Sequence, residues 1–269
     1  MKKTILITGS TDGIGKEIAF ELATRGHRVI MHGKRESHGK KLAETFKKET
    51  GNAEIYYFNA DLSDLTEINN LSDSLKSKFS HLDVLLNNAG VFMNNKIILP
   101  NGFETTFMVN HLAVFALTLN LLDLVNQSPQ GRIIVTSSMA QSSSIDFNNL
   151  NGEKYWDSYN AYAVSKLENI LFTYKLARLL KSENSKVTAN CLHPGVISTK
   201  LLHAGWGMGG GSLQQGAATS LYLATSEEVD EVSGNYFVNK KSHKSVAFSY
   251  DHKAQDKLWQ ISNELIKKG

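Results

Sequence analysis

Short apolar, β-branched runs alternate along the chain with longer stretches in which apolar residues recur at the helical period. The runs predict seven strands, at 4–8, 28–32, 54–58, 83–87, 132–136, 187–192 and 235–238. The predicted helices lie near 14–25, 38–50, 64–78, 104–126, 158–182, 213–225 and 253–267. Strands separated by helices pair in parallel, and right-handed crossovers place the helices on both faces of the sheet. We therefore predict an α/β fold with a doubly wound, Rossmann-type, seven-stranded and mainly parallel sheet.

No repeat, low-complexity tract or linker rich in Pro, Gly or Ser interrupts this alternation, so 1–269 is predicted to be a single domain. Two stretches fall outside the alternation. The stretch 139–157 is polar, and 195–212 contains Trp206 and Met208 among closely spaced glycines. Irregular stretches of this length in a compact domain are usually functional or mobile.

The composition excludes several classes of protein. With 41% hydrophobic and 20% charged residues, the chain is globular rather than disordered. Its single cysteine, Cys191, can form no internal disulfide, and the apolar stretch at 5–7 is too short for a signal peptide. No apolar run approaches the ~18 residues of a membrane span, so we expect a cytoplasmic protein with no membrane span.

Neither nucleic acid nor metal is an expected partner. The net charge of +3 comes from scattered lysines after residue 239, and no aromatic residues are interleaved with them to stack on bases. A solvated terminal helix explains these lysines better than a nucleic-acid patch does. The nine histidines form no H-x-x-x-H pair, and the Gly-x-Ser-x-Gly elbow of a hydrolase is absent from the sequence.

The first predicted strand runs into a glycine-rich loop and then directly into a helix: Gly9-Ser10-Thr11-Asp12-Gly13-Ile14-Gly15. Gly9 permits a tight turn, Gly13 lets the backbone approach a pyrophosphate, and Gly15 allows close packing of helix on strand. The helix N-terminus offers free N–H groups and positive potential to phosphates. The spacing G-x-x-x-G-x-G is neither the Rossmann nor the P-loop pattern, so a plain glycine turn is the alternative.

The end of the second predicted strand bears on which dinucleotide binds. Folds that select NAD place an acid there for the ribose hydroxyls, whereas basic side chains accept the 2′-phosphate of NADP. Lys34 and Arg35 stand at this point, and no acid follows before Glu36. We therefore predict NADP(H) as the preferred cofactor, with NAD(H) as the alternative. Asp12 counts against the phosphate unless it only caps the following helix.

A second group of polar residues suits proton transfer. Tyr162 and Lys166 are four residues apart in a predicted helix, so both project from one face, and an ammonium beside a phenol lowers the pKa of the phenol. Such a tyrosine can exchange a proton with a carbonyl oxygen. Ser138 follows a predicted strand at the edge where ligands bind to parallel sheets, and Asn110 interrupts a very apolar helix.

These residues belong to motifs that follow one another in a fixed order: Thr8-Gly9-x-x-x-Gly13-x-Gly15, Asn87-Asn88-Ala89-Gly90, Asn110, Ser138, Tyr162-x-x-x-Lys166 and Pro194-Gly195-x-x-x-Thr199. In them the chain resembles the short-chain dehydrogenase/reductase family along nearly its whole length. Further motifs are similar to the retinol-dehydrogenase-like branch of that family: Tyr159-x-x-Tyr162-x-x-Ser165-Lys166-Leu167-x-Asn169, His193-Pro194-Gly195, Ser233-Gly234-x-Tyr236-Phe237 and Leu258-Trp259-x-x-Ser262.

The resemblance implies a role for each matching residue. Tyr162 would be the general acid/base, and Lys166 would lower its pKa and bind the nicotinamide ribose. Ser138 would orient the carbonyl, and Asn110 would hold a proton-relay water. Further cofactor contacts are implied for Asp61, Leu62, Asn88, Ala89, Gly90, Pro194, Gly195, Ile197 and Thr199. The cofactor half would span about 1–135 and the catalytic and substrate half about 136–269.

The leading hypothesis is an NADP(H)-dependent oxidoreductase that interconverts a carbonyl and an alcohol on an apolar small molecule by hydride transfer. A catalytically silent dinucleotide-binding sensor or scaffold is the alternative. Trp156, Trp206 and Met208 would either line an apolar substrate pocket or only pack the loops on the core. The helices 104–126 and 158–182 are apolar beyond one face, which predicts a homodimer or homotetramer through a shared four-helix interface.

Overall fold

The computed structural model describes residues 1–267 and forms one eight-stranded sheet in the order β3-β2-β1-β4-β5-β6-β7-β8. The strands are β1 (Thr4–Ile7), β2 (Arg28–Gly33), β3 (Ile55–Asn59), β4 (Val84–Asn87), β5 (Arg132–Thr136), β6 (Thr188–His193), β7 (Tyr236–Val238) and β8 (Lys241–His243). Strands β1 to β7 pair in parallel. The predicted doubly wound, mainly parallel α/β fold is therefore confirmed.

The number of strands differs from the prediction of seven, because β8 pairs antiparallel with β7. Asn239 and Lys240 form the two-residue turn between them, with φ of 48° and 63°. Two consecutive positive φ values are those of a tight hairpin whose twist matches its strands. The three residues of β8 are all exposed. A strand without a buried face leaves no hydrophobic pattern in the sequence.

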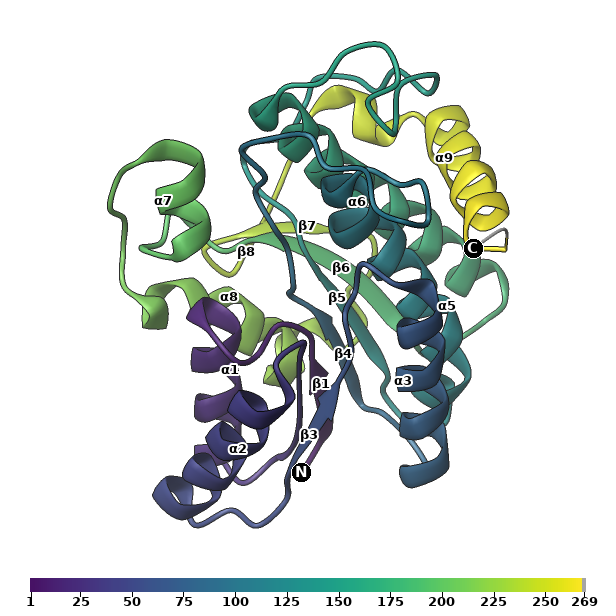
Figure 1. The fold of residues 1–269 in the computed structure, drawn as a ribbon. Coiled ribbons are helices and arrows are strands. Elements are labelled where there is room, and N and C mark those ends of the chain that lie inside the picture. The colour runs from purple at the N-terminus through teal and green to yellow at the C-terminus, as the bar shows by residue number, and fades with distance from the viewer. Residues whose placement is uncertain (268–269) are drawn as a thin grey trace.

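The helices cover both faces of the sheet (Figure 1). On one face lie α1 (Gly13–Thr24), α2 (Glu36–Thr50) and α8 (Leu213–Thr225). On the other lie α3 (Leu65–Lys78), α5 (Ala113–Asn126), α6 (Ser158–Ser182) and α9 (His252–Leu265). Short 3-10 helices span Glu227–Val229 and Ala247–Tyr250. Both faces of the central strands are thus buried, which explains their nearly continuous apolar sequences.

The helix predicted at 104–126 is continuous but irregular. It consists of α4 (Thr105–Phe107), a π-helical turn (Met108–Leu112) and α5. The span Thr105–Asn126 has a mean hydropathy of 1.6, so by length and composition alone it could cross a membrane, contrary to the expectation that no stretch would qualify. However, 72% of its apolar 18-residue window is buried inside the fold. Here it serves as a core helix on one face of the sheet.

The stretch 195–212 contains a helix that the pattern did not predict, α7 (Lys200–Trp206). Thr199 caps its first turn by accepting a hydrogen bond from Leu202 N at 3.2 Å. Gly207 ends it in the left-handed region with φ of 62°. A helix of seven residues is too short to show a clear apolar periodicity.

Helix α9 bears on the predicted oligomer. Its Trp259 ring stacks on Phe172 of α6 at 5.8 Å between centroids and meets Phe115 of α5 edge-on at 5.0 Å. Helix α9 of the same chain therefore covers apolar residues of α5 and α6 that do not face the sheet. This accounts for part of the apolar surface that suggested a four-helix interface, and the dimer or tetramer stays a prediction.

Candidate active site

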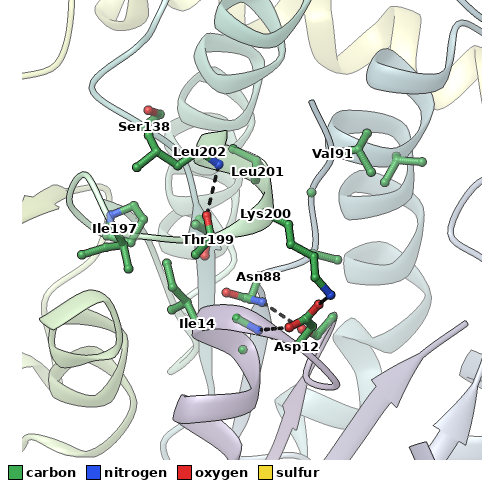
Figure 2. A pocket seen from close by; sticks show the side chains of 18 of the residues that line it. Asp12, Ile14, Asn88, Val91, Ser138, Ile197, Thr199, Lys200, Leu201 and Leu202 are labelled. Atoms are coloured by element: carbon green, nitrogen blue, oxygen red, sulfur yellow. Dashed lines mark hydrogen bonds and ion pairs between the residues drawn. The ribbon is translucent and has the colours of Figure 1, made fainter. Parts of the chain in front are cut away.

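A cleft of about 1200 Å³ opens at the carboxyl ends of the central strands. Strands β1 and β4 are neighbours there, although β2 and β3 lie between them in the sequence. The strand order reverses at this point, and ligands of open α/β sheets bind at such reversals. Figure 2 shows the side chains that converge on the cleft from the loop after β1, the ends of β4 and β5, and the segment around α7.

The glycine-rich loop has the close packing expected of a phosphate cradle. A Cβ at Gly15 would lie 2.3 Å from Gly9 O and 2.5 Å from Asn88 Nδ2, so only glycine fits there. Gly9 has φ of 65°, as a tight turn requires. Helix α1 begins at Gly13, and its first residues line the cleft. The backbone N–H groups at this helix end fit the pyrophosphate of a dinucleotide.

Asp12 caps α1, which was the alternative raised for it in the sequence. Its Oδ1 accepts a hydrogen bond from Gly13 N at 2.9 Å, and its Oδ2 forms an ion pair with Lys200 of α7 (Figure 2). The hydrogen bond from Lys200 holds the pKa of Asp12 below its usual value. Lys200 was not predicted as a site residue, because nothing in the sequence links it to a loop nearly two hundred residues away. Its charge offsets the negative charge that Asp12 brings to the cleft.

Lys34 and Arg35 line the cleft beyond the end of β2, together with Asp61 and Leu62. Lys34 Nζ lies 3.9 Å from Asp61 Oδ2, and 70% of the Lys34 side chain is exposed. An exposed pair at this distance is weak. Lys34 is therefore free to turn toward an anionic group in the cleft.

Tyr162 and Lys166 project from the first turns of α6, whose N-terminus is capped by Asp157. Lys166 Nζ lies 5.3 Å from the centre of the Tyr162 ring and donates a hydrogen bond to Thr136 O at 3.2 Å. Ser138 hydrogen-bonds to the Tyr162 hydroxyl, and its Oγ also accepts from Ala140 N at 3.0 Å. The cleft thus holds a phenol, a serine hydroxyl and an amine, which together can bind a carbonyl oxygen and supply its proton.

The pKa of Tyr162 differs from the expectation. Burial raises it to about 12, and the hydrogen bond with Ser138 only partly opposes this shift. Burial likewise lowers the pKa of Lys166 to about 8. The expected lowering by Lys166 is not found in the protein alone, because the amine hydrogen-bonds to the Thr136 carbonyl and not to the phenol oxygen.

Asn110 lies directly behind the cleft wall and is fully buried. Its Oδ1 accepts from Val91 N at 2.8 Å, and its Nδ2 donates to Val91 O and to Ser165 Oγ, both at 3.0 Å. A Cβ at Gly90 would lie 3.3 Å from Asn110 Oδ1 and 3.4 Å from Lys166 Nζ. Asn110 therefore supports the segment that separates it from Lys166.

Most of the predicted cofactor contacts line this one cleft: Gly9, Thr11, Asp12, Gly13, Ile14, Gly15, Lys34, Arg35, Asp61, Leu62, Asn88, Ala89, Gly90, Tyr162, Lys166, Pro194, Gly195, Ile197 and Thr199. Ser10 is the exception, because it is buried behind the loop. Its Oγ accepts from His32 N at 2.8 Å and donates to His32 O. Ser10 thereby joins the loop to β2 and offers the cleft no hydroxyl.

Two residues that support Ser138 were missed by sequence reasoning. Tyr236 of β7 donates to Ser138 O at 3.1 Å, and His193 Nδ1 accepts from Met139 N at 3.1 Å. Both side chains are at least nine-tenths buried. Polar residues at buried strand positions were the available signal, since such groups need hydrogen-bond partners.

The end of the cleft around Tyr162 is apolar. Met139, Leu201, Trp206 and Met208 line it. Trp206 meets the Tyr162 ring edge-on at 5.6 Å between centroids, so it lies directly beside the phenol. Trp156, also predicted here, lines a separate small cavity with Glu104 and Glu168 instead. Within residues 1–267, no three His, Cys, Asp or Glu side chains are grouped to hold a metal ion.

A family model described as short chain dehydrogenase matches residues 3–206. The chain belongs to this family. Curated relatives include human polyprenol dehydrogenase, 36% identical over an alignment that covers 98% of this chain and 84% of the relative. Human retinol dehydrogenase 11 is 38% identical, with 98% and 86% covered. These relatives place the chain in the retinol-dehydrogenase-like branch, as an NAD(P)-dependent oxidoreductase acting on CH–OH groups.

Solved structures share the fold. An uncharacterised protein from Mycobacterium paratuberculosis superposes with a TM-score of 0.83 at 30% identity, covering 98% of this chain and 93% of that one. A short chain dehydrogenase from Shigella flexneri in complex with NADP has a TM-score of 0.70 at 25% identity, with 89% and 97% covered.

Proposed function

We propose that this protein is an NADP(H)-dependent oxidoreductase that interconverts an alcohol and a carbonyl on an apolar small molecule. The observation that carries the proposal is the convergence of Ser138, Tyr162 and Lys166 on the cleft that also contains the glycine-rich loop. One cleft thus contains both a loop suited to bind phosphate and side chains suited to transfer a proton. Asn110 supports this arrangement from behind.

The nicotinamide, when bound, supplies or accepts the hydride. Lys166 would bind its ribose, and Ile197 and Thr199 would contact the carboxamide. The residues of the chain itself transfer the proton. Ser138 donates to the carbonyl oxygen, and Tyr162 gives that oxygen its proton during reduction or removes the proton during oxidation.

Preference for NADP(H) over NAD(H) is supported by Lys34 and Arg35 at the adenosine end of the cleft. The ion pair between Asp12 and Lys200 removes the main objection, because it neutralises the acid that would repel a 2′-phosphate. The complex of the Shigella flexneri relative with NADP agrees with this proposal. An apolar substrate is supported by the side chains around Trp206 and by the names of the retinol and polyprenol dehydrogenase relatives.

The test is cofactor binding followed by turnover. NADPH fluorescence should change on mixing with the protein, and a panel of apolar aldehydes, ketones and alcohols should contain substrates that are turned over faster with NADP(H) than with NAD(H). Binding without turnover of any member would favour the silent sensor or scaffold instead. Absence of cofactor binding would overturn both.

A further inference from the structure

The C-terminal helix reaches the catalytic region through one buried hydrogen bond. Ser262 of α9 lies with its Oγ 2.7 Å from Nε2 of His111, and both residues are fully buried. His111 belongs to the π-helical turn Met108–Leu112 and directly follows Asn110. A contact at the end of the chain thus touches the backbone that carries a candidate catalytic residue.

The other ring nitrogen of His111, Nδ1, faces the side chain of Asn169 on α6. Neither this nitrogen nor Asn169 Oδ1 has a hydrogen-bond partner within residues 1–267, so each is available to the other. Buried polar atoms are rarely left unpaired. Asn169 is three residues beyond Lys166 on the same helix, so His111 lies between α9 and the helix that carries the catalytic pair.

The protonation state of His111 follows from its surroundings. Burial lowers its pKa to about 3, so the ring is neutral near neutral pH and carries a single N–H. A neutral imidazole donates from one nitrogen and accepts at the other. An amide oxygen can only accept, whereas the serine hydroxyl can donate. All these groups are satisfied together when Nδ1–H donates to Asn169 Oδ1 and Ser262 O–H donates to Nε2.

We propose that Ser262, His111 and Asn169 form a buried hydrogen-bonded bridge that makes α9 a positioning element for Asn110 and Lys166. A π-helical turn is rare within an α-helix and is frequently found at functional sites, so contacts to this turn bear on the position of Asn110. Asn110 holds Val91 and Ser165 from one side of this turn. The bridge holds the same turn from the side of α9.

The aromatic cluster around Trp259 fastens α9 beside the bridge. Trp259 packs on Phe115 and Phe172, and the His111 ring lies 6.2 Å from Phe115 and stacks at 5.7 Å on Phe107. At the other end of α9, Asp256 pairs with Lys175 and Arg178 of α6. Packing therefore keeps α9 in place when only the serine hydroxyl is removed, which makes the bridge testable by a small substitution.

The test compares Ser262→Ala with Gln260→Gly. The first removes the hydroxyl of the bridge, and the second weakens the same helix at an exposed position whose side chain donates a hydrogen bond to Glu264. We expect Ser262→Ala to lower kcat about fivefold to tenfold, with the KM values for cofactor and substrate within about twofold of the parent. Gln260→Gly should keep the parent kcat although it also lowers the unfolding stability.

A second readout does not depend on turnover. Nitrogen-15 NMR of the histidine rings should show His111 as the neutral Nδ1–H tautomer in the full chain. An Nε2–H tautomer, or an equal loss of kcat in both variants, would overturn the bridge. The kinetic readout rests on the proposed function. If the parent shows no turnover at all, that function fails, while the tautomer still decides the bridge.

Discussion

The amino group of Lys166 lies 5.3 Å from the centre of the Tyr162 ring, and both side chains are more than nine-tenths buried. Burial acts on the two groups in opposite directions, because it raises the pKa of Tyr162 to about 12 and lowers that of Lys166 to about 8. Each shift favours the uncharged form. The protein alone therefore presents a protonated phenol to the cleft, which suits the donation of a proton to a carbonyl oxygen.

Replacement of Tyr162 by phenylalanine tests this proton transfer. Tyr162→Phe removes one hydroxyl while the ring still packs against Trp206 and Phe92, so fold and NADPH affinity should be kept. Turnover should fall by at least about a hundredfold, the low end of what general acid–base catalysis contributes. Tyr159→Phe changes a half-exposed neighbouring tyrosine in the same way and is the matched control. Its turnover should be close to that of the parent. A Tyr162→Phe variant with the parent kcat would mean that another group moves the proton.

The pH dependence of the two reaction directions should differ. Alcohol oxidation needs the Tyr162 phenolate, so its rate should rise with pH over the range below the raised pKa of about 12. Carbonyl reduction needs the protonated phenol, so Tyr162 should not limit it between about pH 6 and pH 9. Initial rates measured in both directions check this. An oxidation rate that is flat across this range would show that the phenol is ionised already.

Neutral substitutions at Lys34 and Arg35 test the cofactor preference. The Lys34→Gln, Arg35→Gln double variant removes the positive side chains at the adenosine end of the cleft. The ratio of the NADH to the NADPH dissociation constant should fall at least about tenfold, which corresponds to a change of about 1.4 kcal/mol in relative binding free energy. Fluorescence titration with both cofactors measures the ratio. Equal affinities in the parent protein would refute the preference before any variant is made.

Lys166→Met is expected to stabilise the fold while it abolishes turnover. The pKa of Lys166 falls from 10.5 to about 8 on burial, which corresponds to a cost of about 3 kcal/mol when the native amine is charged. This cost is present in full below about pH 8. Between the two pKa values the unfolded chain binds the extra proton, so the stability of the parent rises with pH.

The stability advantage of Lys166→Met should therefore shrink from about pH 7 to about pH 9.5, as measured by urea unfolding. Lys181→Met, at an exposed position on the same helix, should show a difference from the parent that does not change over this interval. If the difference in unfolding free energy between Lys166→Met and the parent also stayed constant with pH, burial would not be lowering the pKa of the amine. Such a result would place a charged partner near it.

The parts of the fold that the sequence predicts are those with a buried face. Strands β1 to β7 read as short apolar runs and the long helices show apolar residues at the helical period, and these patterns locate each element within a few residues. The exposed β8 and the seven-residue α7 have no such pattern. Residue type and spacing along the chain were enough to predict the site residues of the glycine-rich loop, Ser138, Tyr162 and Lys166.

The spacing of residues in the sequence shows neither how burial shifts a pKa nor which distant residues come into contact. The spacing of Tyr162 and Lys166 predicts a lowered phenol pKa, but the fold buries both groups and reverses the shift. Lys200 meets Asp12 only because the segment after β6 and the loop after β1 line the same cleft, although β4 and β5 lie between the two strands. Tyr236 reaches Ser138 from another strand in the same way. Which partner each residue meets depends on tertiary structure and cannot be inferred from the local sequence.

A buried acid in α6 offers a separate test of how burial controls charge. Glu168 is 1% exposed, and neither of its carboxyl oxygens has a hydrogen-bond partner within residues 1–267. Burial raises its pKa well above 4.5, and the nearby Glu104 adds to the shift. Asp146 lines the same small cavity, as does Trp156, whose ring nitrogen is also unpaired there. The carboxyl is therefore held in its protonated form.

Glu168→Gln replaces this protonated acid by a neutral side chain of the same shape. Above pH 4.5 the unfolded parent releases a proton that the folded parent keeps, so the stability of the parent falls as pH rises toward the raised pKa. The amide does not titrate, so the variant should gain stability relative to the parent between about pH 5 and pH 8 in urea unfolding. Glu183→Gln, at an exposed position just beyond α6, should show no such trend. If the gap for Glu168→Gln stayed the same at both pH values, the Glu168 carboxyl would already be ionised, and its two unpaired oxygens would need a cation to hold them.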